Sequence, residues 1–370
     1  MNTYSMLGIG LLSGTIIGAG IFSLPYVFSQ IGIFAGIGYL ILFASIYASV
    51  YSMYASLLAK EEGTHDFFFL AKKYLPVWAV PTVIVTTIGG LLFALLAYLT
   101  LISPFVSFAW GVGGWWIIFI FWVVSSLFIF VKVNALGWAE FFGTASILCA
   151  VLFIAFLAFG SLASAQAPSS GGIISFSLIL MPFGPILFSF AGRSAISQVV
   201  RIWKEGKKAF SLYAVIRGGV FIPAVVYIIF ALSIIVLSPY SVSGDSLSGL
   251  VTLPFYAKTI LAIVGFFTLW TSYIMLTNNT RDILLYDMRF PKVIAFGVPI
   301  LIPLFLLFLG LDDFMEVVEI AGGIFVALEG LFMVWMWYRA FPRHPLRKYA
   351  YIPIAVFAVS FIYICTTLFV

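Results

Sequence analysis

The sequence predicts an all-helical membrane protein with many transmembrane helices. Of its residues, 64% are hydrophobic and only 8% are charged, whereas soluble domains carry roughly 25% charged residues. Two long apolar segments are interrupted by glycine and proline, at 14–25 and 183–193. Backbone groups freed by such breaks are tolerated at membrane depth only where they are buried in protein or line a cavity. Two breaks about half a chain apart are typical of secondary transporters that bind their substrate near the midplane.

Apolar length and breaks predict eleven spans, each near or above the ~20 residues that a helix needs to cross a bilayer. They run over about 6–29, 33–58, 77–105, 114–131, 136–160, 173–200, 211–237, 254–286, 291–310, 313–339 and 349–369. The loops support this count. All 18 Lys and Arg residues except Arg193 and Lys258 lie in or beside the loops that follow spans 2, 4, 6, 8 and 10. By the positive-inside rule, the N-terminus is cytoplasmic and the C-terminus lies outside the plasma membrane.

We expect one transmembrane domain over residues 1–370, with no soluble domain. The small polar residues of 161–172 predict an external loop, and the aromatic and basic residues of 61–75 predict a short amphipathic helix on the cytoplasmic surface. Ile21-Phe22-Ser23 is weakly echoed by Leu187-Phe188-Ser189. Two five-helix halves, about 6–160 and 173–339, would then form inverted repeats, and the last helix, about 349–369, would lie outside them.

Several other classes of protein are disfavoured. The basic pI of about 9.1 reflects membrane topology rather than a nucleic-acid-binding face. Cys149 and Cys365 both lie in apolar spans, and His65 and His344 are isolated in loops, so we expect neither a disulfide framework nor a metal site. No Lys or Arg precedes the first apolar run, which disfavours a cleaved signal peptide. Without a His/Asp/Glu cluster, a Ser-Lys or paired-Asp motif or a nucleotide-binding loop, we expect no enzyme and no cofactor.

Gly18-Ala19-Gly20 is the central motif of the first span. One interpretation is helix packing, because Gly14 and Gly18 form a GxxxG pattern. A dinucleotide fingerprint is disfavoured, because no strand precedes the motif and Ser23 occupies the third glycine position. The third interpretation is an unwound segment whose N–H groups, aided by a half-helix dipole, bind a carboxylate. Pro25 and the second break favour this third interpretation.

Three segments resemble a known family. Gly14-Thr-Ile-Ile-Gly-Ala-Gly-Ile-Phe-Ser-Leu-Pro25 closely resembles the first helix of permeases of the amino acid–polyamine–organocation superfamily. Glu62-Gly-Thr-His65, followed by Leu70-Ala-Lys-Lys-Tyr-Leu75, is similar to the loop between helices 2 and 3 of the aromatic amino-acid (tryptophan/tyrosine) branch, and Phe188-Ser-Phe-Ala-Gly192 is similar to its sixth-helix break. The resemblance implies a LeuT-type fold, in which helices 1, 2, 6 and 7 move against a scaffold of helices 3, 4, 8 and 9.

The resemblance also implies a substrate site at the two breaks. The carboxylate of an amino acid would meet the N–H groups of Gly18, Ala19 and Gly20. Its ammonium group would meet carbonyl groups near Ile16 and of the sixth helix, and one aromatic ring would face the side-chain pocket. The residues of the sixth helix are Phe188, Ser189 and Ala191 for the carbonyl groups and Phe190 for the ring.

The coupling ion is predicted to be Na⁺ or H⁺, with Na⁺ favoured. Thr271 and Ser272 could supply hydroxyl oxygens, and the carbonyls of Gly14 and Ile17 would complete an all-oxygen site that suits a hard cation. The alternative for these hydroxyls is helix–helix hydrogen bonding. Some proton-coupled relatives place a lysine of helix 5 in this space, and span 5 has no lysine there. Against Na⁺, the branch that the chain resembles includes proton symporters.

Three ionisable residues, Arg193, Glu140 and Glu329, are predicted within the membrane, about 12–15 Å from the cytoplasmic boundary. They could form an inner gate or a proton relay, because such residues are functional by default. The alternative is a structural ion pair with Arg193 extending to the interface. Glu316 and Glu319 near the outer end of span 10 are expected to be solvated or to line an outer vestibule.

Together these observations predict a secondary transporter that imports a neutral or aromatic L-amino acid with a coupling cation, as a monomer or homodimer in the lipid bilayer. One rival is a membrane sensor that keeps the permease fold and signals on binding, as spore-germinant receptor subunits do. Such a sensor would act within a complex, so a stable transporting monomer would exclude it.

Overall fold

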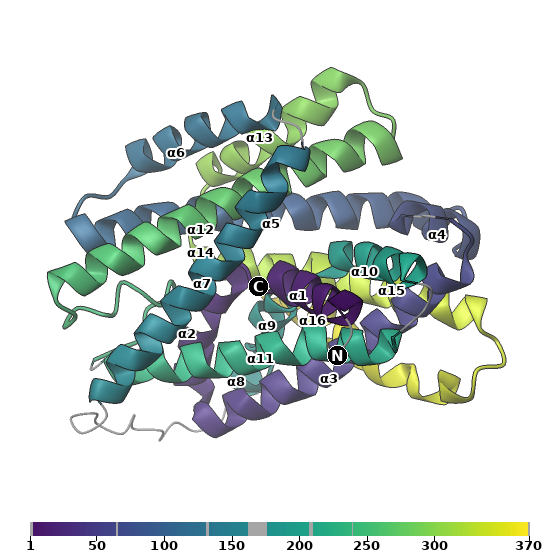
Figure 1. Ribbon diagram of the computed structural model, residues 1–370, viewed down its shortest axis with the longest axis horizontal. Helices are drawn as coiled ribbons and strands as arrows, with labels where there is room; N and C mark the ends of the chain where they lie inside the picture. Colours follow the sequence, from purple (N-terminus) through teal and green to yellow (C-terminus); the bar gives the residue numbers. More distant parts are fainter. Residues whose placement is uncertain are drawn as a thin grey trace.

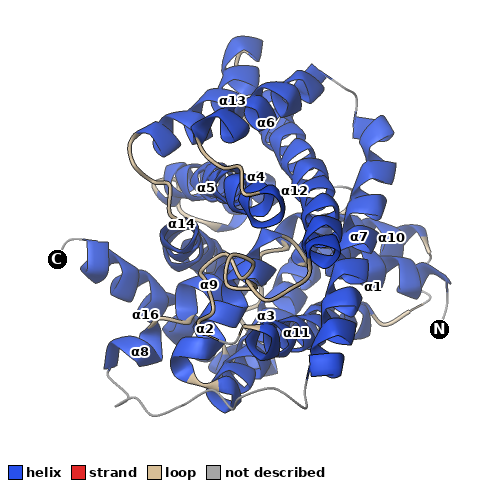
Figure 2. Cartoon of the chain, turned by 90° about the vertical axis from the view of Figure 1, so that its left-hand side faces the viewer, coloured by secondary structure: helices blue, strands red, loops and turns tan. Residues whose placement is uncertain are grey.

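The computed structural model describes residues 3–63, 66–130, 133–161, 176–206, 210–238 and 240–368, with the side chains of 133–142, 176 and 177 outside this description. These residues form a bundle of helices with no strand among them (Figure 2). The first half contains α1 (Thr3–Ile16), η1 (Ala19–Ser23), α2 (Leu24–Ile31), α3 (Ile33–Lys60), α4 (Phe67–Tyr74), α5 (Ala79–Trp110), α6 (Trp115–Leu127), η2 (Phe128–Phe130) and α7 (Val133–Ser161).

The second half begins with the short helices α8 and α9. It contains α8 (Phe176–Leu180), α9 (Phe183–Ser189), α10 (Arg193–Glu205), α11 (Leu212–Leu237), α12 (Phe255–Asp282), η4 (Ile283–Asp287), α13 (Lys292–Phe308), α14 (Phe314–Ile320), η5 (Ala321–Val326), α15 (Ala327–Ala340), η6 (Pro345–Tyr349) and α16 (Tyr351–Leu368). η4 and η5 are π-helical turns that continue α12 and α14.

Among the described residues, seven helices are long and apolar enough to cross a membrane. Two further pairs pass the same test together but bend at a short break, by 51° between α1 and the η1–α2 segment and by 45° between α8–α9 and α10. Two shorter apolar helices, Trp115–Phe130 and Lys292–Phe308, complete the set. The chain is therefore an all-helical integral membrane protein, and its two bent helix pairs are interrupted where glycine and proline occur in the sequence. The predicted short helix of 61–75 is also present, as α4.

The broken helices lie at the centre of the bundle. α1 packs against α10 and α11, and α9 packs against the π-helical turn η5. On one side α3 and α11 run together, and on the other α12 packs on α5 and α7 (Figure 1). α6 and α13 lie at the far edge of α5, tied together by a 2.9 Å hydrogen bond from Trp122 Nε1 to the Ile300 carbonyl. The two breaks are thus enclosed by long, unbroken helices.

Sequence explains where the breaks fall. In α1 the last regular bond runs from Ile17 N to Ser13 O, and the next, from Ile21 N to Gly18 O, already belongs to the tighter turn of η1. Pro25 stands in the first turn of α2, where its missing N–H costs no helical hydrogen bond. In the sixth span, Pro182 and Pro185 flank the start of α9, and Gly192 precedes α10 as its N-cap, with a non-helical backbone (φ −152°, ψ 20°).

Candidate functional site

The two breaks lie directly against each other. A Cβ atom added to Gly20 would lie 2.6 Å from Ser189 Cα, and the Ser189 hydroxyl donates a 2.9 Å hydrogen bond to the Gly20 carbonyl. Residue 20 therefore has to be glycine for the two backbones to approach this closely. This contact brings together the segments that the sequence identified as the two halves of one site.

A cavity of about 170 Å³ lies at the breaks. It extends from them toward the second half of the sixth span and the end of α12, and it is lined mainly by apolar groups, backbone and hydroxyls. Six of the eight predicted substrate residues line it: Ile16, Gly18, Ala19, Gly20, Phe188 and Ala191. The other walls come from α5, α12, η5 and α15, through residues such as Thr86, Tyr98, Asn279, Phe325 and Glu329.

The remaining two predicted residues, Ser189 and Phe190, are not among the residues that line this cavity. The Phe190 ring is fully buried, stacks on Tyr47 with centroids 5.5 Å apart and meets Tyr227 edge to face at 5.7 Å. The aromatic residue of α9 that lines the cavity is instead Phe188. In this conformation Phe190 packs the sixth span onto α3 and α11 rather than facing a side-chain pocket.

Buried tyrosines satisfy the carbonyl groups that the breaks release. The Tyr227 hydroxyl lies 2.8 Å from the Ile16 carbonyl and 2.7 Å from the Ser189 carbonyl, so one side chain bridges both breaks. Tyr47 donates to the Leu187 carbonyl at 2.8 Å. Since a hydroxyl has one proton, Tyr227 can donate fully to only one of its two carbonyls at a time.

Tyr51 serves both sides of the second break. Its hydroxyl donates to the Phe190 carbonyl at 2.7 Å and accepts from the Gly192 N–H at 2.6 Å. Two of the carbonyls expected to receive a substrate ammonium, those of Ile16 and Ser189, thus share the single proton of Tyr227, and the Phe188 carbonyl accepts from the Ala191 N–H at 3.1 Å. A bound ammonium group would have to use their second lone pairs or displace these donors.

Tyr98 is a residue of the site that sequence reasoning missed. It stands on α5 and lines both the cavity at the breaks and a second cavity beside it. Its hydroxyl interacts with the N–H of Ala19 and the side chain of Ser272, and it lies 3.1 Å from where a Cβ of Gly18 would be. A tyrosine in an aromatic-rich apolar span gives no signal of its own, because its role depends on which helix it faces.

The second cavity, of about 230 Å³, contains three of the four predicted cation ligands: Gly14, Ile17 and Ser272. Thr144 of α7 and Thr268 of α12 add hydroxyls to the same wall. Thr271 is not among its lining residues. Its hydroxyl donates to carbonyls of its own helix and lies 2.4 Å from where a Cβ of Gly143 would be. Among the described residues, no group of three His, Cys, Asp or Glu side chains is placed to hold a metal ion.

Two of the three predicted intramembrane charges meet. Arg193 Nε and Glu329 Oε1 form an ion pair, both side chains line the cavity at the breaks, and they are 12% and 16% exposed. The guanidinium also lies 4.2 Å from the centre of the Phe67 ring of α4. The ion pair joins α10 to α15 at the side where the cavity extends. The side chain of Glu140, the third predicted member, lies outside the described residues.

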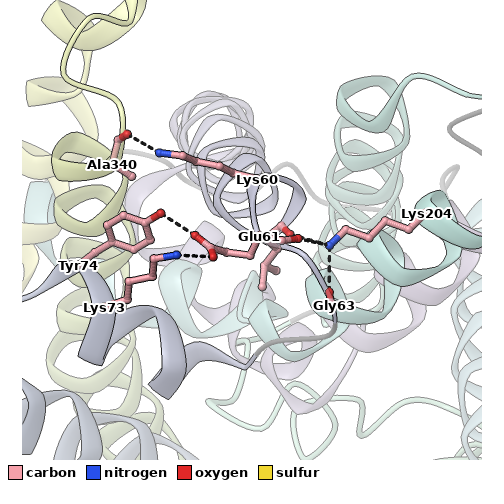
Figure 3. Close-up of polar contacts among 8 residues, drawn as sticks. Lys60, Glu61, Gly63, Lys73, Tyr74, Lys204 and Ala340 are labelled. Carbon is pink, nitrogen blue, oxygen red and sulfur yellow. Dashed lines mark hydrogen bonds and ion pairs between the residues drawn. The ribbon is translucent and has the colours of Figure 1, made fainter.

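Further along α10 than Arg193, Lys204 joins the end of α10 to the end of α3 (Figure 3). Its ammonium group donates hydrogen bonds of 2.7–3.0 Å to the main-chain carbonyls of Leu58, Glu61 and Gly63. These carbonyls lie at the C-terminal end of a helix, where acceptors have no partner within the helix and a cation is electrostatically favoured.

The neighbouring side chains fasten α4 and α15 to the same end of α3 (Figure 3). The Glu61 carboxylate accepts from Lys73 at 2.5 Å and from the Tyr74 hydroxyl at 2.6 Å, and Lys60 donates to the Ala340 carbonyl at 3.0 Å. Burial and the hydrogen bond to Glu61 raise the pKa of Tyr74 to about 12, so this phenol stays protonated at neutral pH and remains a donor.

Comparison with solved structures identifies the fold. The chain is similar to a mutant of the Eremococcus coleocola manganese transporter, with a TM-score of 0.64 and 13% identity over 96% of this chain and 85% of that one. It is similar to Mhp1, a nucleobase-cation-symport-1 family transporter, in a closed conformation with bromovinylhydantoin bound (TM-score 0.55, 11% identity, 97% of this chain and 89% of that one). The inward-facing conformation of Mhp1 gives a TM-score of 0.57 at 13% identity, over 92% of this chain and 77% of that one.

No protein-family model and no curated protein sequence matches the chain. At such low identity the structural likeness shows the fold alone. That fold is the LeuT-type fold, and the similar structures are named as transporters rather than as enzymes.

Proposed function

We propose that the chain is a secondary transporter that works by alternating access, with eleven transmembrane helices arranged as two inverted five-helix repeats and one extra helix. The seven long helices, two bent pairs and two shorter apolar helices support this count. The single observation that carries the proposal is the meeting of the two breaks at one cavity. Irregular backbone at membrane depth is tolerated where it is buried or lines a cavity, and in transporters such segments form the substrate site.

The proposed substrate is a neutral or aromatic L-amino acid. The N–H groups of Gly18, Ala19 and Gly20 lie at the start of a new helical segment, where the preceding turn supplies no acceptors and the helix dipole favours a carboxylate. The Ala19 N–H, which interacts with the Tyr98 hydroxyl, would be shared with the carboxylate. The carboxylate and guanidinium at the cavity wall, Glu329 and Arg193, already neutralise each other. A substrate with a charged side chain would therefore find no free counter-charge, which supports a neutral one.

The proposed coupling ion is Na⁺, held by the hydroxyl of Ser272 and the carbonyls of Gly14 and Ile17. These groups line one cavity next to the substrate cavity, together with further hydroxyls, and all of them offer oxygen ligands. Because Tyr98 lines both cavities and interacts with Ala19 and Ser272, it could transmit ion binding to the first break.

The proposed conformation is inward-facing. On the side away from the cavity, Phe22 packs against Phe105 and Phe230 with ring centroids 5.1 and 5.7 Å apart. The buried Ser246 hydroxyl donates to the Phe22 carbonyl, which holds the loop between α11 and α12 over the first span. The cavities extend in the opposite direction, toward Arg193, Glu329 and Asp282, where the basic loops predict the cytoplasm.

A thermal-shift screen of the purified chain with each of the twenty amino acids, with and without Na⁺, tests the proposal. Ligands that bind the folded protein raise its stability by mass action. We expect one neutral or aromatic amino acid to give the largest shift and Na⁺ to increase it, and the same amino acid to be taken up by proteoliposomes. Binding without uptake by the isolated chain would favour the sensor, and the absence of any amino-acid shift would refute the substrate class.

A further inference from the structure

One transmembrane helix, α3, has two chemically different faces. Ser-x-Tyr occurs three times along it, at 45–47, 49–51 and 52–54. Residues two apart on a helix point about 200° apart, so the serines and the tyrosines lie on opposite sides. The tyrosines are buried, and two of them bond to the sixth span. The serines lie on the outer side of α3, and the proposed substrate site gives this side no role.

The serine face of α3 borders a groove of about 960 Å³. Its opposite walls are the first two turns of α11, the end of α15, the following loop and the start of α16. Ser49 belongs to the wall formed by α3, and residues of the opposite walls include Arg217, Trp337, His344, Tyr349 and Ile352. Leu42, Ser45 and Ser49 are exposed, so the groove is open to the surroundings of the protein along α3.

The groove offers an apolar surface despite its serines. Each serine hydroxyl donates to a carbonyl of its own helix: Ser45 to Ile41, Ser49 to Ser45, Ser52 to Ala48 and Ser56 to Met53, at 2.6–2.9 Å. The O–H groups of these serines are therefore already engaged within the helix, and the serines present only small side chains to the groove. Leu42, Ile46 and Met53 add apolar side chains to this wall. From Ser56 to Leu42 the wall is about 21 Å long, at 1.5 Å per residue.

A cation stands at one end of the groove. Arg217 lies one helical turn from Tyr213 and Ala214 on the same face of α11, and all three line the groove. It is exposed and, among the described residues, has no hydrogen bond or ion pair. His344 and Tyr349 line the facing wall. This end coincides with the ends of the helices where the basic loops predict the cytoplasmic surface.

We propose that this groove binds one anionic phospholipid of the cytoplasmic leaflet, with its phosphate at Arg217 and an acyl chain along the serine face of α3. A hollow of this size that opens to hydrocarbon is filled by lipid, because an empty one would forfeit the dispersion contacts of its walls. Basic pockets between transmembrane helices on the cytoplasmic side suit anionic headgroups. The length of the wall matches an extended acyl chain rather than a small polar solute.

A second copy of the chain fits the groove less well. Two copies in one membrane have the same orientation, so a two-fold axis would place both Arg217 side chains at the same depth and close together. Their charges would repel each other, whereas a lipid phosphate accepts hydrogen bonds from a guanidinium in paired geometry. Charge complementarity therefore selects the lipid.

Native mass spectrometry of the full chain, delipidated in detergent and titrated with phosphatidylglycerol or phosphatidylcholine, tests the proposal. We expect one phosphatidylglycerol to be retained more tightly than phosphatidylcholine, and glycerol 3-phosphate, which has the phosphate but no chains, to give no binding. Arg217→Gln should weaken phosphatidylglycerol binding by roughly tenfold or more and remove the preference between the two lipids. Arg289 is an exposed arginine of the loop before α13, so Arg289→Gln is the matched charge control. This variant should keep both the affinity for phosphatidylglycerol and the preference for it over phosphatidylcholine.

A second pair of variants tests the acyl-chain wall. Ser49→Phe should fill the groove and displace the lipid, whereas Gly38→Phe, on the same helix with no atom near its added Cβ, should leave the lipid bound. Equal retention of both lipids, equal losses with Arg217→Gln and Arg289→Gln, or unchanged binding in Ser49→Phe would each overturn the proposal. So would a dimer that Ser49→Phe dissociates, since the groove would then be a protein interface. None of these readouts depends on the transported substrate.

Discussion

Replacing Gly20 by alanine tests whether the close contact of the two breaks forms the substrate site. The added Cβ would lie 2.6 Å from Ser189 Cα, 2.8 Å from its Oγ and 3.1 Å from its Cβ. Carbon atoms pack at about 3.5–4.0 Å, so the two backbone segments must separate by about 1 Å. The first of these contacts is to backbone, which cannot rotate away as a side chain could.

The magnitude follows from the cost of overpacking, about 1–3 kcal/mol for one extra methyl group in a close-packed region. If the breaks bind substrate only when they touch, this cost appears as a loss of affinity of roughly 5- to 150-fold. The larger side chain of Gly20→Val should abolish detectable binding. The Ser189–Gly20 hydrogen bond of 2.9 Å would also be stretched, which acts in the same direction.

The assay is the amino-acid thermal shift, with the amino acid that gives the largest shift on the unmodified protein, followed by uptake into proteoliposomes. Gly10→Ala is the matched control, because Gly10 lies on the same span, is exposed and has no atom within 4 Å of its added Cβ. We expect normal affinity in this control. Wild-type affinity in a folded Gly20→Ala protein would refute the assignment of the two breaks to the substrate site.

Three further predictions follow from the same geometry. Ser272→Ala should abolish Na⁺-stimulated uptake. Wild-type uptake that does not depend on Na⁺ but is abolished by a protonophore would show that the coupling ion is H⁺. Arg193→Ala should slow turnover far more than it weakens binding, and its effect should be non-additive with that of Glu329→Gln in a double-mutant cycle; full additivity of the transport rates would leave the ion pair with no role as a gate. Lys204→Met should destabilise the protein by about 1.5–3 kcal/mol, seen as a lower Tm in detergent, because three carbonyls lose a charged donor; exposed Lys72→Met is the control, and equal Tm values would show that these bonds contribute nothing.

The positions of the breaks could be predicted from sequence because they are encoded locally. Gly18 and Gly20 remove the side chains that would keep two backbones apart, and Pro25 suits only the first turn of a helix. The pairing of Arg193 with Glu329 was also accessible, because a guanidinium at membrane depth requires an acceptor and few carboxylates lie at that depth. The first prediction depends on backbone preferences of neighbouring residues, and the second depends on the cost of an unpaired charge at a depth that the sequence gives.

The direction in which a side chain points from its helix was harder to predict from the sequence. Periodicity predicts which residues share a face of an unbroken helix, but this relation does not continue across a break. The direction of the Phe190 side chain could therefore not be predicted from the residues of α9. Thr271 and Ser272, both predicted as cation ligands, illustrate how the direction of a side chain depends on its position around the helix. Adjacent residues on a helix point about 100° apart and do not face the same space, and in the structure only Ser272 lines the cavity.

The partners of the broken backbone come from distant helices, and they bear on how the site can work. Tyr51 and Tyr227 satisfy carbonyls that would otherwise cost several kcal/mol each in the membrane, so the breaks are stable without a ligand. Yet Tyr227 bridges two carbonyls with a single proton, and one acceptor is always incompletely satisfied. The ammonium group of the proposed amino-acid substrate would bring three donors to this place. Its binding would then draw the two breaks together with hydrogen bonds that the empty site cannot complete. Such a difference in free energy between the empty and the substrate-bound protein is what a ligand needs to shift a conformational equilibrium.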